Sequence, residues 1–222
     1  MKVLGLDPSL TNFGWAVHDT SATGKARCVE RGRFQTSTRT LFIERYSDLR
    51  SRLRELLVRT GVRYVGCEYP VFNDLWSEGM YGLFLYSCEA MLDHGVDVVF
   101  FSPGQVKAHA RLLLNRPKIG NKLWEMKKSD MCDAARADTG GKGRWNHNEA
   151  DAYLVARSAG RFWGYVDGAL TKADLTDIER KQFSEVHTFK RGRRVGDTVR
   201  RGIEYREGER FFRWTNKDTE DG

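Results

Sequence analysis

The first nineteen residues, Met1–Asp19, constrain the fold of this chain more than any other segment. A short apolar run, Val3–Leu6, ends at Asp7 and Pro8, and a second apolar run follows a polar turn at Phe13–Val17. This order predicts two strands joined by a tight connection, with a carboxylate at the end of the first strand. Such an aspartate either forms the turn before proline or ligates a divalent metal from the end of a buried strand.

The chain up to about residue 165 is predicted to alternate strands and helices. Further strands are expected at Ala26–Gln35, Val62–Tyr69 and Val96–Phe101. Apolar residues at helical spacing predict helices at Leu41–Val58, at Leu75–Leu92, from Pro103, from Glu125 or Lys127 to Asp138, and at Asn148–Trp163. Three antiparallel strands followed by parallel strands, flanked by helices, make a mixed sheet of the α/β class.

The character of the sequence changes after Tyr165, so we expect a main domain over residues 1–165 and an extension over residues 166–222. The segment His187–Trp214 predicts short strands and a small β-rich unit. It is rich in arginine, with interleaved aromatic residues at Phe189, Tyr205, Phe211, Phe212 and Trp214. These side chains either contact nucleic acid or pack on the main domain.

Composition narrows the class of protein. The longest apolar runs are much shorter than a membrane span, and the first residues lack the order of a secretory signal, so we expect a cytosolic protein without a membrane partner. The four cysteines have no metal-site spacing and are expected to be reduced. A net charge of +7 and a pI near 9.3 favour a polyanionic partner.

Three acids occupy comparable places in the predicted fold. Asp7 ends the first strand, Glu68 ends the fourth, and Asp151 lies in the first turn of the last long helix. Neighbouring strand ends point to one spot, and three carboxylates there repel one another unless cations neutralise them. Two magnesium ions, which activate a water and stabilise the leaving 3′ oxygen of a phosphodiester, would account for this arrangement.

Five segments together resemble the ordered motifs of the RuvC-type Holliday junction resolvases, dimeric nucleases of the RNase H-like superfamily. They are GLDPSLTNFGWAV (Gly5–Val17), VGCEYPVF (Val65–Phe72), SPGQVK (Ser102–Lys107), KKSDMCDA (Lys127–Ala134) and NEADAYLVA (Asn148–Ala156). The resemblance extends over Met1–Arg161, and the Ser-Leu-Thr-Asn turn is similar to that of bacteriophage-encoded members. It implies an RNase H-like fold and a homodimer in the host cytoplasm, which nicks four-way and other branched DNA to leave 5′ phosphates.

The resemblance also implies roles for individual residues. Asp7 would contact both metal ions, and Glu68 and Asp151 would each hold one. The metal would be Mg²⁺, two ions per active site, with Mn²⁺ as a substitute.

Further positions match the part of the family that meets DNA or the second subunit. Lys107 and Lys128 match two lysines that approach DNA near the cut. Phe72 is the nearest candidate for the aromatic that enters the junction centre, although it lies one position later than in the family and follows an added Pro70. The apolar helix Leu75–Leu92 matches the dimer interface.

The fourth ligand position departs from the family pattern. Asn148 stands three residues before Asp151, where the family has Asp or His. His147 is four residues before Asp151 and therefore on the same helical face, whereas Glu149 would point away. His147 and Asn148 are equal candidates for a catalytic metal ligand or for a group that orients one. The alternative is that Asn148 only caps the helix and His147 belongs to the loop.

Three other functions remain open at the level of sequence. One is an RNA-processing nuclease of the same superfamily. Another is a catalytically weak or inactive junction-binding protein, which the asparagine at position 148 favours. The last is a sugar-kinase-like ATPase, although the turn PSLTN lacks the glycine and paired hydroxyls of a phosphate loop.

Overall fold

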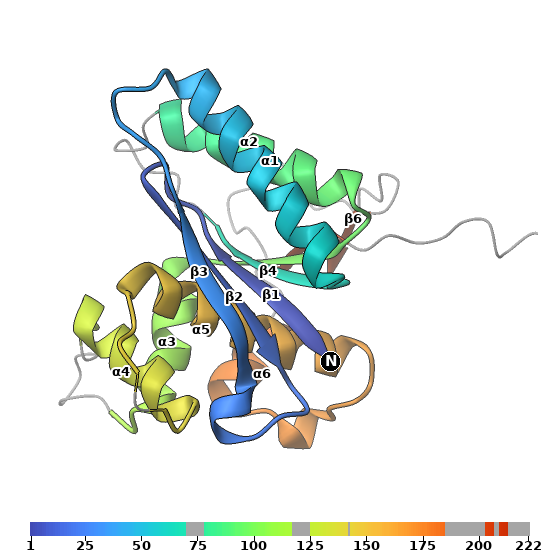
Figure 1. Ribbon diagram of the computed structural model, residues 1–222. Coiled ribbons are helices and arrows are strands. Elements are labelled where there is room, and N and C mark those ends of the chain that lie inside the picture. Colours follow the sequence, from blue (N-terminus) through green and yellow to red (C-terminus); the bar gives the residue numbers. More distant parts are fainter. Residues whose placement is uncertain (70–77, 117–124, 142, 185–202, 207–208, 213–222) are drawn as a thin grey trace, which may run out of the picture.

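The computed structural model describes residues 1–69, 78–116, 125–141, 143–184, 203–206 and 209–212 (Figure 1). Phe72 and most of the predicted extension beyond residue 184 lie outside the described residues. Within the described residues, no helix is both long and apolar enough to cross a membrane.

The centre of the molecule is a mixed sheet with the strand order β3-β2-β1-β4-β5. The strands are β1 (Lys2–Asp7), β2 (Asn12–Asp19), β3 (Cys28–Gln35), β4 (Tyr64–Glu68) and β5 (Asp97–Phe101). The first three are antiparallel neighbours, whereas β4 pairs parallel with β1 and β5 pairs parallel with β4. The prediction of a mixed α/β sheet is therefore confirmed.

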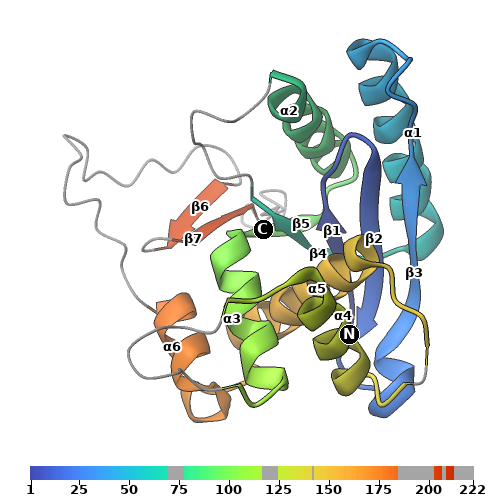
Figure 2. The same cartoon turned by 90° about the vertical axis from the view of Figure 1, so that its left-hand side faces the viewer.

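Helices cover both faces of the sheet (Figures 1 and 2). One face carries α1 (Phe42–Thr60) and α2 (Glu78–Asp93), and the other carries α3 (Pro103–Leu113), α4 (Lys128–Asp138), α5 (His147–Val166) and α6 (Asp177–Ser184). Short 3₁₀ turns occur at η1 (Gly24–Arg27) and η2 (Lys172–Asp174). Each face has its own buried apolar cluster, because alternate residues of a strand point to opposite sides of a sheet.

The long helix α5 lies unusually close to the sheet because glycines of three strands face it. A Cβ atom added to Gly5 of β1 would lie 2.0 Å from the carbonyl oxygen of Ala152. At Gly14 of β2 it would lie 2.2 Å from the carbonyl oxygen of Asn148. Any larger residue would push the helix away, so these glycines fix where the first turns of α5 sit on the sheet.

The region after residue 165 is described in part. Leu175 and Phe183 are buried in the same cluster as α5, and Glu179 of α6 forms an ion pair with Arg161. Two four-residue strands, β6 (Ile203–Arg206) and β7 (Glu209–Phe212), pair with each other, and β7 also pairs antiparallel with β5. The domain boundary at residue 165 and the β-rich nature of the extension stay predictions, because most of 185–222 is outside the described residues.

Candidate active site

Three acidic residues from distant parts of the chain meet at one edge of the sheet. Asp7 ends β1 and Glu68 ends β4, and the preceding residues, Leu6 and Cys67, pair in register between these parallel strands. Gly14 is the register partner of Asp7 and supports the first turn of α5, which carries Asp151. The sheet and the close approach of α5 thus bring together the three acids predicted from the sequence.

The electrostatics of these acids reflect their burial and their proximity. Burial raises the pKa of Asp7 well above its usual range, and the charges of Glu68 and Asp151 raise it further. Burial and the charge of Asp151 raise the pKa of Glu68 to about 7. Burial raises the pKa of Asp151 to about 6, although two lysines oppose the shift. The cluster therefore resists full ionisation.

The donor set fits a bound cation. Oδ1 of Asp151 is buried and has no hydrogen-bond partner among the described residues, so a favourable contact for this oxygen is missing. Carboxylate oxygens are the ligands that Mg²⁺ prefers. Among the described residues, however, no three His, Cys, Asp or Glu side chains already form a group that could hold a metal ion. The acids are gathered at one place, and a cation would have to draw their oxygens into a ligand set.

Lys107 and Lys128 lie on two helices beside the acids, and both side chains are exposed. The positive charge of Lys107 lowers the pKa values of Glu68 and Asp151, and that of Lys128 lowers those of Asp7 and Asp151. The two lysines predicted to meet DNA therefore do lie near the acids.

The start of α5 differs from the expected capping. The side chain of Asn146, two residues earlier than the candidate Asn148, accepts a hydrogen bond from the backbone N–H of Asn148 at 3.0 Å and caps the helix. The Asn148 side chain instead donates to the carbonyl oxygen of Asn12 at 2.8 Å and ties α5 to the start of β2. His147 is the first helical residue, not part of the loop.

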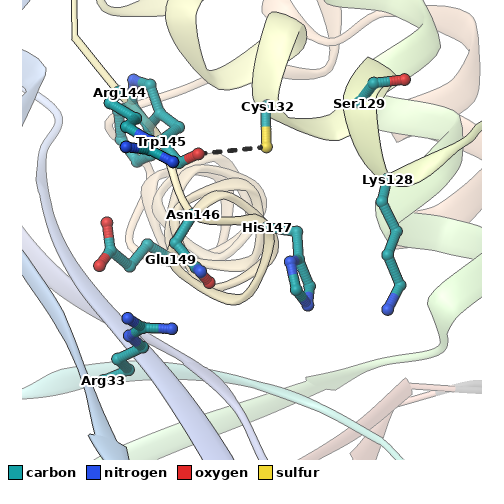
Figure 3. Close-up of a pocket in the computed structure, with 9 residues that line it drawn as sticks. All are labelled: Arg33, Lys128, Ser129, Cys132, Arg144, Trp145, Asn146, His147 and Glu149. Carbon is teal, nitrogen blue, oxygen red and sulfur yellow. Dashed lines mark hydrogen bonds between the residues drawn. The ribbon is translucent and has the colours of Figure 1, made fainter.

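His147 lies beside a pocket that the sequence did not indicate (Figure 3). Burial and the charges of Lys128 and Arg33 lower its pKa, so its imidazole is neutral near pH 7, the form that can ligate a metal. Arg33 was not singled out from sequence, because an arginine in a half-exposed strand is ordinarily solvated. Its register opposite Gly14 is the signal that would have placed it near Asp7.

Comparisons with known proteins agree with this architecture. No family model and no curated protein sequence matches the chain significantly. Two structures of RuvC from Thermus thermophilus are similar, one alone and one in complex with a Holliday junction substrate. The free form is 24% identical with a TM-score of 0.57, and the complex 21% identical with a TM-score of 0.56.

Both matches cover 70% of this chain and about 90% of RuvC: 91% of the free form and 90% of the complex. The yeast mitochondrial Holliday junction resolvase Ydc2 is also similar, at 13% identity and a TM-score of 0.42, covering 76% of this chain and 84% of Ydc2. The two RuvC structures show that the chain shares the fold of RuvC.

Proposed function

We propose that this protein is a magnesium-dependent, structure-selective DNA endonuclease that resolves four-way junctions and other branched DNA by paired nicks. The products carry 5′ phosphates. One observation carries the proposal: Asp7, Glu68 and Asp151 are gathered in a largely buried place without an ion-pair partner among the described residues. The RuvC structure solved with a Holliday junction supports the choice of substrate.

Other buried acids of the chain show why this observation is informative. Asp97 pairs with Arg63 at 3.2 Å, and Glu179 pairs with Arg161 at 2.8 Å. Asp130 pairs with Arg116. Burying a carboxylate is costly unless it is paired. The fold pairs these three acids with arginines, whereas the cluster at this edge has no such partner among the described residues.

Two Mg²⁺ ions, or Mn²⁺ in their place, would neutralise that cluster. Asp7 would touch both ions, Glu68 and Asp151 one each, and His147 is the better placed fourth ligand, because the amide of Asn148 is bound to Asn12. When bound, the metal ions supply an activated water and stabilise the leaving 3′ oxygen.

The protein's own groups bind and orient the strand. Lys107 of α3 and Lys128 of α4, two neighbouring helices beside the acids, bind backbone phosphates on either side of the cut. The Asn148 to Asn12 hydrogen bond holds the first turn of α5, and with it Asp151, against β2. Phe72 is proposed to enter the junction centre, as in the family.

A homodimer would place two such sites on one junction. The surface of α2 supports this, because Tyr81 and Leu85 are each 49% exposed and Leu92 is 37% exposed, which is unusual for a helix facing water. A two-fold symmetric pair cuts two opposed strands symmetrically. The turn Ser9–Asn12 further suggests a phage-encoded protein that acts in the cytoplasm of the host cell.

The test measures cleavage and binding of a synthetic four-way DNA junction in Mg²⁺. Asp7→Asn and Glu68→Gln are expected to lower cleavage by a factor of about 10³ or more while junction binding is kept, because these changes remove metal ligands but no positive charge. Asp133→Asn, an exposed acid of α4, is the matched control. Cleavage that persists in either variant contradicts the proposal.

A junction-binding protein without strong catalysis is the second candidate, favoured by the purely structural contact of Asn148. It predicts tight junction binding and no nicking by the unaltered protein with either Mg²⁺ or Mn²⁺. Flap DNA and RNA duplexes, assayed beside the junction, separate the RNA-processing alternative from both.

A further inference from the structure

A pocket of about 650 Å³ opens next to the acids, between β3 and the starts of α4 and α5 (Figure 3). Arg33, Lys128, Arg144 and His147 are among the residues that line it. In Figure 3, Lys128 and His147 extend toward the same side, and Arg33 approaches from the strand across from them.

The lining of the pocket is strongly positive. Arg33, Lys128 and Arg144 come from a strand, a helix and a loop, and all three are exposed. None of them forms an ion pair with a carboxylate within the part of the chain that the structure describes. The acid of the lining, Glu149, is already bound to Arg31 at 3.1 Å. The pocket therefore has uncompensated positive charge that suits an anion.

The backbone adds to this preference. Lys128 and Ser129 begin α4, and His147 begins α5, so the first turns of two helices border one pocket. The first N–H groups of a helix have no partner inside it and favour negative charge. In this pocket they reinforce the charged side chains.

The tryptophan of the pocket is not available to stack a base. Trp145 is only 7% exposed. The guanidinium of Arg31 lies 3.7 Å from the centroid of the Trp145 ring, and Tyr153 packs against the same indole with the ring centroids 5.4 Å apart. A nucleotide base would find no open tryptophan face, whereas a phosphate would meet several cations.

Lys128, which lines the pocket, also lies near the acids. The charge of Lys128 acts on Asp7 and Asp151 on one side and on His147 on the other, and Arg33 acts on His147 in turn. A strand whose phosphate lies at the carboxylates would thus pass Lys128 and reach Arg33 and Arg144 next.

We propose that the pocket formed by Arg33, Lys128 and Arg144 binds a backbone phosphate of the strand being cut, adjacent to the scissile phosphate. The proposal rests on the nuclease function proposed above and extends it to a binding site that holds one side of the cut strand. Recognition is of the phosphate and not of the base, so this contact is independent of sequence.

The first experiment measures binding of a four-way DNA junction at several salt concentrations, with Ca²⁺ in place of Mg²⁺ to prevent cleavage. Arg33→Ala and Arg144→Ala are each expected to weaken binding about fivefold and to lower the magnitude of the salt slope by about one. Arg52→Ala, an exposed arginine on α1, is the control for loss of one charge and is expected to change neither quantity.

The second experiment tests the assigned contact directly. A single neutral methylphosphonate is placed at successive positions next to the cut in one junction strand. One position is expected to weaken binding by the unaltered protein but to have no further effect on Arg33→Ala or on Arg144→Ala, because the interaction is already lost.

Two results overturn the proposal: both variants bind like the unaltered protein, or the losses add at every methylphosphonate position. Neither result affects the nuclease proposal if the unaltered protein still nicks the junction. Conversely, failure of the unaltered protein to nick any junction overturns the nuclease proposal whatever the arginine variants do.

Discussion

Asp151 on α5 and Asp138 at the end of α4 are two largely buried acids, but their surroundings differ completely. Asp138 accepts hydrogen bonds from Tyr153 at 2.7 Å and from Arg27 at 2.9 Å, and Arg157 lies 3.0 Å away. Asp151 leaves one buried oxygen without any partner among the described residues.

The pKa values show the same contrast. Burial raises the pKa of Asp138, but the charge of Arg157 and the hydrogen bond of Tyr153 outweigh burial and bring the pKa below its usual value. At Asp151, burial raises the pKa to about 6 and the nearby lysines do not compensate. One acid stabilises the fold, whereas the other opposes folding unless a cation binds. Burial alone therefore does not leave an acid uncompensated in this protein. The negative charge at Asp151 is uncompensated because of its particular surroundings in the site.

The largest expected effect on stability comes from removing Asp138, the acid whose oxygens are all paired. Asp138→Ala leaves the buried Tyr153 hydroxyl and the partly exposed Arg27 and Arg157 without their shared acceptor, so the free energy of unfolding should fall by about 3 kcal/mol. Urea unfolding followed by circular dichroism measures this. The control is Asp133→Ala, which removes an exposed partner of Arg136 on the same helix and should cost under about 0.5 kcal/mol. If both variants lost the same free energy of unfolding, Asp138 would contribute no more to stability than an exposed acid.

A gain in stability, instead of a loss, is expected when the charge of Glu68 is removed from the cluster of three acids. Without metal at pH 8, Glu68→Gln should raise the free energy of unfolding by about 2 kcal/mol, since it removes a charged carboxylate whose pKa is raised by folding. The folded-state pKa of about 7 exceeds the ordinary value of 4.5. The destabilisation by ionised Glu68 therefore grows as the pH rises from 4.5 to 7 and is complete above pH 7. The advantage of the variant should therefore shrink between pH 7 and pH 4.5 and be absent below.

The difference between the variant and the unaltered protein is the quantity to compare across pH. His18 and His109, whose pKa values burial lowers to about 4, titrate in both proteins and cancel in the difference. A stability difference that is constant over the whole interval would show that Glu68 is not under electrostatic stress.

Metal binding gives the smallest of the three expected effects. Mg²⁺ at about ten times its dissociation constant should stabilise the unaltered protein by about 1.4 kcal/mol at pH 8, and less at pH 5.5, where protons compete for the same oxygens. Thermal unfolding with and without the ion measures this. Asp138→Asn should keep the Mg²⁺ response, whereas Asp7→Asn should lose it. A response that survives in Asp7→Asn would place the ion elsewhere.

Local pattern in the sequence was sufficient to predict the mixed α/β sheet and the positions of the three acids at its elements' ends. Asp7 and Glu68 end short apolar runs, and Asp151 lies at the start of a helix with strong periodicity, so their convergence follows from the way parallel strand ends align. Their roles in catalysis stay predictions.

Contacts between distant segments determine what the sequence could not predict. Two asparagines flank the start of α5, and which of them caps the helix depends on the carbonyl of Asn12 in β2, which takes the side chain of Asn148. Arg33 meets the site only through the register of β3 on β2. No periodicity within one segment encodes such a pairing.

The placement of the three acids on β1, β4 and α5 has a consequence for the timing of biosynthesis. Asp7 leaves the ribosome early, but its partner Asp151 is made only after strands β1 to β5 and α4. The glycines that let α5 approach the strands have nothing to pack against until then. A nascent or prematurely terminated chain thus carries two of the acids without the third, and the cluster of three acids is complete only when the last long helix docks.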